Sequence, residues 1–312
     1  IYTVRLDAQG GVVWEARYNG VENWIDVPKG VGVDAAGNTY VAGTTWGGRR
    51  SDGGSDWDYI TIKYAPDGTE LWARQYDGRG NWSDLPEAMT VSPDGDVYVA
   101  GFSFVEANPD GGYATHFHVV AYDTDGNQTW EVLYDLDPHF GAGARDVTLD
   151  PQGNIIATGI VGVVEGLGTQ DDILTMKISP AGQVLWAEHW DSAGEINGLD
   201  DGYLVTTGED GSVFVSGTSF SNVNNRNFDG TVLRYDADGN FQWSFAMDLP
   251  RPDGLGEVAA DADGNLYIPG GWDNTSDTDG VLISLTADGV ERWRHIYDGG
   301  SDGNFQDAHA VM

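Results

Sequence analysis

Hydrophobic and polar positions follow a pattern that recurs along most of this chain. Its clearest copy runs from Asp34 to Trp72. In and beside that copy, short apolar runs are separated by turn residues, at Gly32–Asp34, Thr39–Gly43, Tyr59–Tyr64 and Glu70–Tyr76. Residues 59–64 alternate in polarity, which is the two-residue period of a β-strand. The pattern predicts four antiparallel strands per repeat, which we name A to D in chain order.

Two of the three connections within a repeat are short. Ala36-Gly37-Asn38 joins strands A and B, and Asp67-Gly68 joins strands C and D. Gly and Asn tolerate the positive φ of tight hairpin turns. The B–C and D–A connections are longer and fall on the opposite face, which we call the long-loop face. Because loops often carry function, we expect the site there. The predicted B–C loops are 47–58, 102–116, 160–172, 218–229 and 271–279.

One tryptophan ends each repeat. The spacings between them are 58, 58, 56, 57 and 50 residues, and the tryptophans are Trp14, Trp72, Trp130, Trp186, Trp243 and Trp293. A period of this length is typical of arrays and propellers. Four antiparallel strands repeated radially form a β-propeller blade. The sequence therefore predicts an all-β protein.

The two ends of the chain complement each other. Residues 1–20 match strands C and D, and residues 301–312 match the entry to strand A. Joined, they would make most of a closing blade, the device by which propellers remove sheet edges. Strand B of that blade has no counterpart among the 312 residues, so a closing blade of three strands is an alternative. We predict a six-bladed β-propeller with four-stranded antiparallel blades, as one domain over 1–312. Its repeats are placed at about 21–78, 79–136, 137–194, 195–250 and 251–300, with the closing blade from 301–312 plus 1–20.

The segments DYITIKYAPDGTELWARQYDGRGNWSD and GNTYVAGTT resemble the bacterial beta-propeller repeat family called SBBP. The resemblance extends over nearly the whole chain. It implies the propeller fold and a secreted or cell-surface bacterial protein. It implies no shared enzymatic activity, so function has to be argued from the site.

The charge of the chain excludes some partners. Fifty acidic residues against fifteen basic ones give a net charge of −35. Such a surface repels nucleic acid phosphates and anionic lipid headgroups. There is no cysteine and no apolar run that would insert into a membrane. We expect a secreted or cell-surface protein, bacterial or archaeal, from a saline or Ca²⁺-rich setting.

Carboxylates recur in the D–A loops. The motif Asn23-Trp24-Ile25-Asp26 returns with drift in later repeats. Clustered carboxylates and amide oxygens suit Ca²⁺, and no organic cofactor is expected. The alternative is that each Asp caps its own loop by accepting backbone N–H groups. The candidate metal ligands are Asp26, Asp84, Asp146, Asp200, Glu257 and Asp307.

Tryptophans outside the periodic positions gather in the predicted long loops. Indole rings stack on sugar C–H groups while carboxylates and amides bind hydroxyls, so these residues indicate a carbohydrate site. Packing of the loops and a protein interface are the alternatives. The candidate ligand-binding residues are Trp24, Trp46, Trp57, Trp82 and Trp272.

Catalytic candidates are His116, His118, His139 and Arg145. A His base beside Arg would suit a polysaccharide lyase, and His116 with His118 forms a possible metal pair. Aspartates that end the B–C loops keep the phase of the repeat and are interpreted as structural: Asp58, Asp172, Asp229 and Asp279. No nucleophile elbow, phosphate loop or dinucleotide motif is present.

Three segments beginning at Asp123, Asp236 and Asp261 resemble the start of an EF-hand loop. They lack the flanking helices and the glutamate at loop position twelve, so we interpret them as hairpin turns. The sequence thus favours an extracellular binding or scaffold propeller that engages carbohydrate or a partner protein. A polysaccharide lyase or glycoside hydrolase, and a structural subunit of a surface assembly, remain the alternatives.

Overall fold

The computed structural model describes residues 1–50, 53–78, 82–107, 113–136, 140–165, 168–192, 199–222, 227–247, 253–261, 263–273 and 278–297. Within these ranges the chain forms β-strands and one short 3-10 helix, Val21–Asn23. None of the described helices has the length and apolarity to span a bilayer. The chain divides into two compact units, Ile1–Val147 and Thr148–Met312, with the boundary inside strand β11.

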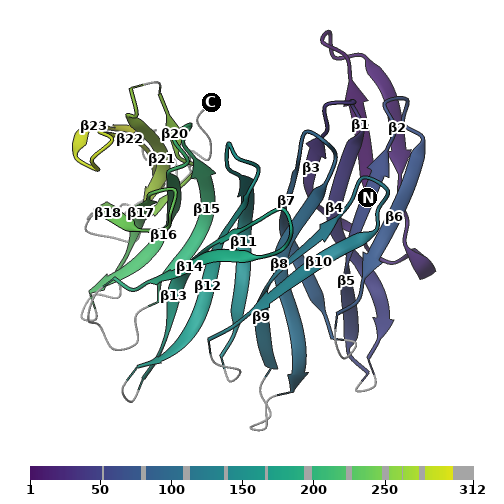
Figure 1. Cartoon of the computed structure of the whole chain (residues 1–312), viewed down its shortest axis with the longest axis horizontal. Helices are drawn as coiled ribbons and strands as arrows, with labels where there is room; N and C mark the ends of the chain where they lie inside the picture. The colour runs from purple at the N-terminus through teal and green to yellow at the C-terminus, as the bar shows by residue number, and fades with distance from the viewer. Residues whose placement is uncertain are drawn as a thin grey trace. The chain divides into compact units, whose positions relative to one another are not determined.

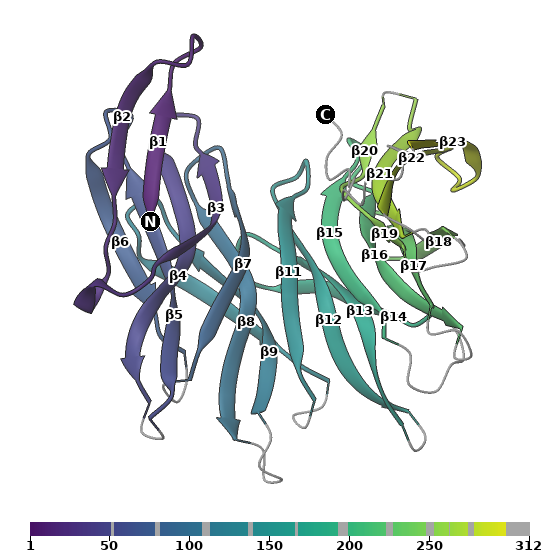
Figure 2. The same ribbon diagram turned by 180° about the vertical axis from the view of Figure 1, so that it is seen from behind.

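The first unit begins with a two-stranded sheet of β1 (Tyr2–Leu6) and β2 (Val12–Arg17). Two four-stranded antiparallel sheets follow (Figure 1), and we call them blade one and blade two. Figure 2 shows the β1–β2 hairpin beside β3 and β4. Blade one is β3 (Val27–Val33), β4 (Thr39–Arg49), β5 (Ser55–Tyr64) and β6 (Glu70–Tyr76); blade two is β7 (Asp84–Val91), β8 (Val97–Ala107), β9 (Tyr113–Tyr122) and β10 (Gln128–Tyr134).

Three further sheets follow, again with strands in chain order. Blade three is β11 (Ala142–Leu149), β12 (Ile155–Glu165), β13 (Gly168–Ile178) and β14 (Val184–Trp190). Blade four is β15 (Asp201–Thr207), β16 (Val213–Asn222), β17 (Asn227–Tyr235) and β18 (Phe241–Met247). Blade five is β19 (Asp253–Leu255), β20 (Ala259–Ala260), β21 (Leu266–Asp273), β22 (Thr278–Leu285) and β23 (Glu291–Tyr297).

The all-β class is therefore confirmed, and blades one to four are four-stranded antiparallel sheets as predicted. Blade five has five strands, because β19 and β20 both pair with β21. The predicted closing blade depends on residues 301–312, which lie outside the described residues. The six-blade count and the single domain over 1–312 stay predictions.

The predicted bounds of strand D were correct in blade one, whereas strands A, B and C are longer than predicted. The β4–β5 ladder continues past Gly43 as far as the pair Arg49↔Ser55. Most of the predicted loop 47–58 is therefore strand, and the same holds for the other B–C segments. The sequence did not predict these strand ends because they are Gly-rich and polar. They pair through backbone hydrogen bonds, which do not require apolar side chains.

The contacts of four periodic tryptophans explain why a tryptophan recurs once in each repeat. Each indole N–H donates to a carbonyl in the C–D turn of the following sheet. The ring also covers the glycine of that turn: a Cβ on Gly68 would lie 2.8 Å from the Trp14 ring, and Gly68 has φ +86°. Only glycine combines that φ with that approach. The donor–acceptor pairs are Trp14–Pro66, Trp72–Thr124, Trp186–Ala237 and Trp243–Ala287.

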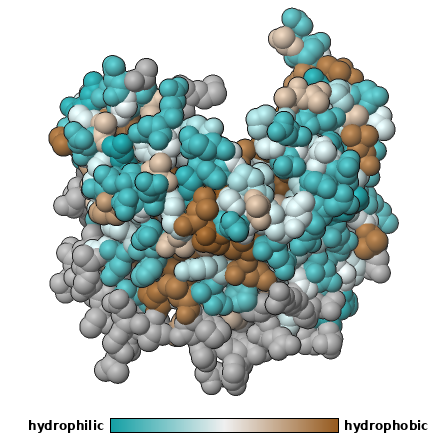
Figure 3. All heavy atoms as spheres, viewed as in Figure 1, coloured by the Kyte–Doolittle hydropathy of each residue, from teal (hydrophilic) through white to brown (hydrophobic). Residues whose placement is uncertain are grey.

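Apolar side chains from neighbouring sheets fill the spaces between them. Tyr40, Tyr59 and Val99 belong to the cluster between blades one and two. Ile156 and Val215 belong to the one between blades three and four. Figure 3 shows that hydrophilic residues cover much of the described surface on one side, as the net charge leads one to expect.

The segments that resemble EF-hand starts are hairpin turns, as predicted. In each, the first Asp accepts the backbone N–H of the Asn four residues later, at 2.8–2.9 Å. The Asn amide donates to the same carboxylate. The carboxylate oxygens are thus used inside the turn, which is the usual function of Asx turns.

Candidate functional site

Three carboxylates come together at the long-loop end of blade one. Asp56 and Asp58 lie on β5, and Asp77 follows β6. One oxygen from each lies within 4.8 Å of the others. Asp56 and Asp58 are buried, at 4% and 1% exposure, whereas Asp77 is exposed. Among the side chains that the structure describes, this is the one such trio of acidic, His or Cys residues.

The local chain geometry explains the convergence. Alternate side chains of a strand share a face, so Asp56 and Asp58 lie on one face of β5 and Trp57 on the other. Tyr59 pairs with Tyr76, which sets Asp77 opposite Asp58 one position further along. A β-bulge between Trp46 and Gly48 breaks the ladder beside them. It brings Gly47 against Asp58, where a Cβ would lie 2.6 Å from the carboxyl carbon.

The chain satisfies these buried carboxylates only in part. The Gln75 amide donates to Oδ2 of Asp58 at 2.5 Å. The Oδ1 atoms of Asp56 and of Asp58 are buried and accept no hydrogen bond. A buried acceptor without a partner costs about 1–3 kcal/mol, and more when it is charged.

Burial is the main cause of a raised pKa at both residues. It raises the pKa of Asp58 to about 7; the Gln75 hydrogen bond opposes this, and neighbouring carboxylates add to it. Burial and Asp77 raise the pKa of Asp56, while Arg50 lowers it. Burial and the neighbouring carboxylates therefore disfavour the charged forms of Asp56 and Asp58.

The predicted metal ligands of the D–A loops occupy a different setting. Asp84 accepts the backbone N–H of Gly78 and the Ser103 hydroxyl, both at 2.6 Å. Asp26 accepts the N–H of Gly20 and the Thr45 hydroxyl in the same way. Burial raises the pKa of Asp84 to about 7, against these hydrogen bonds.

Asp200 accepts two backbone N–H groups, from Ser192 at 2.8 Å and from Phe220 at 3.1 Å. Asp146 accepts the N–H of Val147. Together with Asp26 and Asp84, these contacts are those of the loop-capping alternative. Asp307 lies outside the described residues. Calcium at the predicted ligands stays a prediction.

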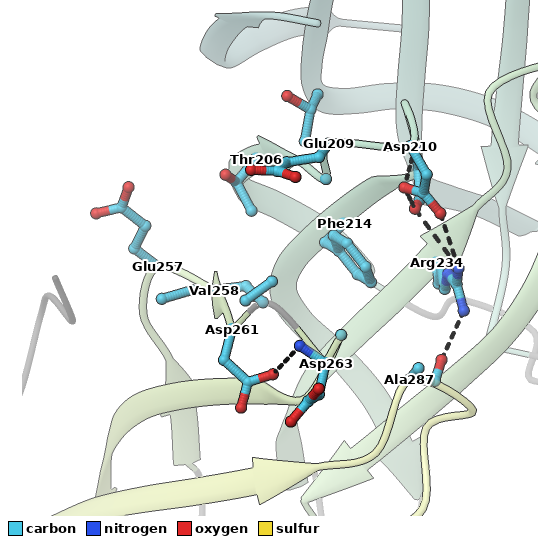
Figure 4. Close-up of a pocket in the computed structure, with 16 residues that line it drawn as sticks. Thr206, Glu209, Asp210, Phe214, Arg234, Glu257, Val258, Asp261, Asp263 and Ala287 are labelled. Carbon is cyan, nitrogen blue, oxygen red and sulfur yellow. Dashed lines mark hydrogen bonds and ion pairs between the residues drawn. The ribbon is translucent and has the colours of Figure 1, made fainter. Parts of the chain in front are cut away.

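Glu257 lines a cavity of about 680 Å³ in the second unit (Figure 4). The cavity lies among the tight turns of blades four and five, away from the predicted long-loop face. Arg234 donates to the Ala287 carbonyl at 2.6 Å and lies 3.6 Å from Asp210. Glu209, Glu257 and Asp263 add further negative charge to the wall. Its chemistry would suit a cation rather than an anionic sugar.

The candidate tryptophans fall into distinct environments. Trp24 is 47% exposed and stacks on Trp46, with ring centroids 4.9 Å apart and planes 26° apart. Trp46 is buried and lies opposite Trp57 in the β4–β5 ladder. Trp82 is half-buried, with the Arg50 guanidinium 4.3 Å from its ring centre. Trp272 is the second-last residue of β21, and its side chain is outside those described.

The two described histidine candidates contact other side chains of blades one and two. His118 is fully buried, and burial lowers its pKa to about 3, so it is neutral near pH 7. Its ring contacts those of Tyr59 and Tyr76, with centroids 5.4 and 4.7 Å away. His116 lies 2.6 Å from Asp135.

Arg145 lies over Phe102 at 4.9 Å from the ring centre. His139 is outside the described residues. The structure describes no contact between these candidates that would form a catalytic pair, and their catalytic role stays untested.

Sequence reasoning missed Asp56 and Asp77 and treated Asp58 as a structural residue. A signal was present: blade one has Asp-x-Asp at 56–58 together with an Asp after the Tyr that ends strand D, a combination that recurs in blade five but not in blades two to four. What the sequence did not show was that these positions are in strands and converge across β5 and β6.

Residues 16–48 match the family described as SBBP, beta-propeller repeat, which confirms the predicted resemblance. A search of curated proteins gave no match. Solved structures with a similar fold include a protein of unknown function from Dyadobacter fermentans, at 13% identity and TM-score 0.55, covering 92% of this chain and 86% of that one.

Two other similar structures have titles that name an activity. The periplasmic gluconolactonase of Pseudomonas aeruginosa has 14% identity and TM-score 0.52, covering 96% of this chain and 79% of that one. A PL25 ulvan lyase bound to -[GlcA(1-4)Rha3S]- has 11% identity and TM-score 0.54, covering 90% and 73%. At these identities the likeness shows the propeller fold alone.

Proposed function

We propose that this chain is an extracellular or cell-surface propeller that binds carbohydrate through the long-loop end of blade one. The observation that carries the proposal is the exposed Trp24 ring stacked on buried Trp46. The buried partner holds the exposed ring in one orientation, so little conformational entropy is lost when a sugar stacks on it. Rigid, exposed indole faces are suited to the C–H faces of sugar rings.

The net charge of the chain narrows the class of carbohydrate that it can bind. At −35, the surface repels polyanions, so we propose a neutral oligosaccharide or polysaccharide. The comparisons support a carbohydrate role only in general terms. One protein of similar fold is titled a polysaccharide lyase bound to a sugar chain, and another a gluconolactonase.

Affinity electrophoresis through gels that contain neutral polysaccharides tests the proposal. Trp24→Ala should weaken retardation at least about tenfold, as expected for the loss of an aromatic anchor. Phe241→Ala is the matched control, because Phe241 is 48% exposed and lies at the start of β18, at the tight-turn end of blade four. Retardation that is equal in both variants would leave Trp24 as a loop-packing residue and count against the proposal.

A product assay on the same mixtures addresses the catalytic alternative. New reducing ends or unsaturated sugars would make the chain a glycoside hydrolase or a polysaccharide lyase. Retardation without products supports a binding module. Neither retardation nor products, with concentration-dependent oligomers in solution, would favour the structural-subunit alternative.

A further inference from the structure

We propose that Asp56, Asp58 and Asp77 bind a divalent hard cation, with Ca²⁺ the expected ion. This site differs from the metal ligands that the sequence predicts in the D–A loops, and it does not depend on the carbohydrate proposal. Its ligands come from β5 and from the residue after β6, at the long-loop end of blade one.

The spacing of the oxygens fits one ion. Ca–O bonds are about 2.3–2.6 Å, so two oxygens on the same Ca²⁺ are at most about 5 Å apart. The three carboxylates offer oxygens within 4.8 Å of one another. The donors are all oxygen, with no His or Cys in the trio, which favours Ca²⁺ over zinc or copper.

The buried orphan oxygens point to a ligand that comes from outside the chain. Asp56 and Asp58 are both more than nine-tenths buried, and Oδ1 of each lacks a hydrogen-bond donor. Two adjacent buried carboxylates repel each other unless a cation or a proton lies between them. The exposed Asp77 leaves a route for an ion from solvent.

The backbone is also shaped around Asp58. The bulge at Trp46 and Gly48 brings Gly47 so close to the carboxylate that a Cβ would displace it. Bulges are frequent next to functional sites, where they redirect backbone and side chains. Among the described residues, Arg50 is a cation that acts on Asp56, and its guanidinium also lies over Trp82.

Titration calorimetry with CaCl₂ on the full chain, stripped with chelator and held at constant ionic strength, tests the site. Asp58→Asn should abolish one saturable binding event or weaken its Kd at least about tenfold. Asp172→Asn is the matched control: it removes the same charge from the same strand position of blade three. It should leave that event unchanged, which separates site binding from general attraction of Ca²⁺ to an acidic protein.

The sequence of blade five repeats the three acids at 277, 279 and 298, and residues 277 and 298 lie outside the described part of the chain. The measured quantity is therefore the loss of one event, whether the whole chain shows one or two. If Asp58→Asn does not fold, Asp77→Asn changes only the exposed ligand and should weaken the same event.

Three results would overturn the proposal: no saturable binding of Ca²⁺, equal losses in Asp58→Asn and Asp172→Asn, or proton uptake by the Asp56–Asp58 pair with no effect of CaCl₂ on it. MgCl₂ in parallel identifies the ion, because Mg²⁺ requires a tighter octahedral site. Stronger binding of Mg²⁺ than of Ca²⁺ would overturn the choice of Ca²⁺.

Discussion

The last residue before the apolar part of strand C is a buried aspartate in both blade one and blade three, but its surroundings differ. Asp58 and Asp172 are 1% and 2% exposed. In blade three, Gln170 donates to Oδ1 of Asp172 at 3.4 Å, and His189 Nδ1 lies 2.9 Å from Oδ2. In blade one, Gln75 takes the place of His189, and Asp56 takes the place of Gln170.

The difference lies two residues upstream in the same strand. An amide at that position satisfies the aspartate inside the chain, whereas a second carboxylate cannot. Blade two is a third variant, with His116 at the strand C position and Asp135 as its partner. The repeat thus keeps a buried or half-buried polar group at this position, and its neighbours decide whether the chain or an external ligand completes it.

The largest expected effect comes from copying the blade one arrangement into blade three. Gln170→Asp places a second buried carboxylate beside Asp172 and removes a donor. Without added metal, we expect the free energy of unfolding to fall by about 3–5 kcal/mol, as for other uncompensated buried charges. Urea denaturation in the presence of chelator measures the change.

Gln170→Asn is the control, because it shortens the donor without adding charge. The reciprocal Asp56→Gln should stabilise the chain in chelator and make its response to CaCl₂ smaller than that of the parent. If Gln170→Asp were as stable as the parent, burial at this position would not destabilise a second carboxylate. The unpaired oxygens of Asp56 and Asp58 would then no longer indicate a missing ligand.

The fold was largely predictable from the sequence because its signals are local. Strand alternation, Gly-Asn turns and one tryptophan per repeat each have a short-range physical cause, and the structure confirms the sheets that they predict. The ends of strands B and C were missed because Gly47, Gly48 and their neighbours look like loop. Their pairing depends on the partner strand and not on their own side chains.

The candidate site was less predictable because it depends on which residues meet across strands. Asp58 alone follows the phase of the repeat and resembles a structural residue. Asp58 becomes a candidate metal ligand only because oxygens of Asp56 and Asp77 lie within 4.8 Å of one of its own. Likewise, Trp24 and Trp46 could be distinguished only by their exposure, 47% against 6%.

Asp200 is a deeply buried aspartate whose two oxygens both accept hydrogen bonds, in contrast to Asp58. Burial raises its pKa to about 6 from an ordinary value of 3.8, against the Ser192 and Phe220 hydrogen bonds. The folded chain therefore binds this proton more tightly than the unfolded chain. The stability that it contributes is fully present below pH 3.8 and is lost as the pH rises through 6.

In the parent, this loss amounts to about 3 kcal/mol at most. Asp200→Asn should remove that part of the pH dependence, although the variant is less stable at every pH because an amide cannot accept both N–H groups. The difference between the two stability curves from pH 3.5 to 7 is the measurement. Parallel curves would mean that burial does not raise the pKa of Asp200, so Asp200 could not serve as a reference for Asp58.

The smallest effect on stability, and the sharpest on the site, is expected from Gly47→Ala. The added Cβ meets the Asp58 carboxylate, so the side chain or the bulge must move, at a cost of about 1–3 kcal/mol. No charge changes, so general attraction of Ca²⁺ to the acidic surface stays constant. Thermal melting with and without CaCl₂ should therefore show a smaller calcium response in this variant than in the parent. Gly254→Ala, where a Cβ has open space, should keep the response of the parent. A full calcium response in Gly47→Ala would show that the bulge does not shape the site, and that blades one and three differ only in their side chains.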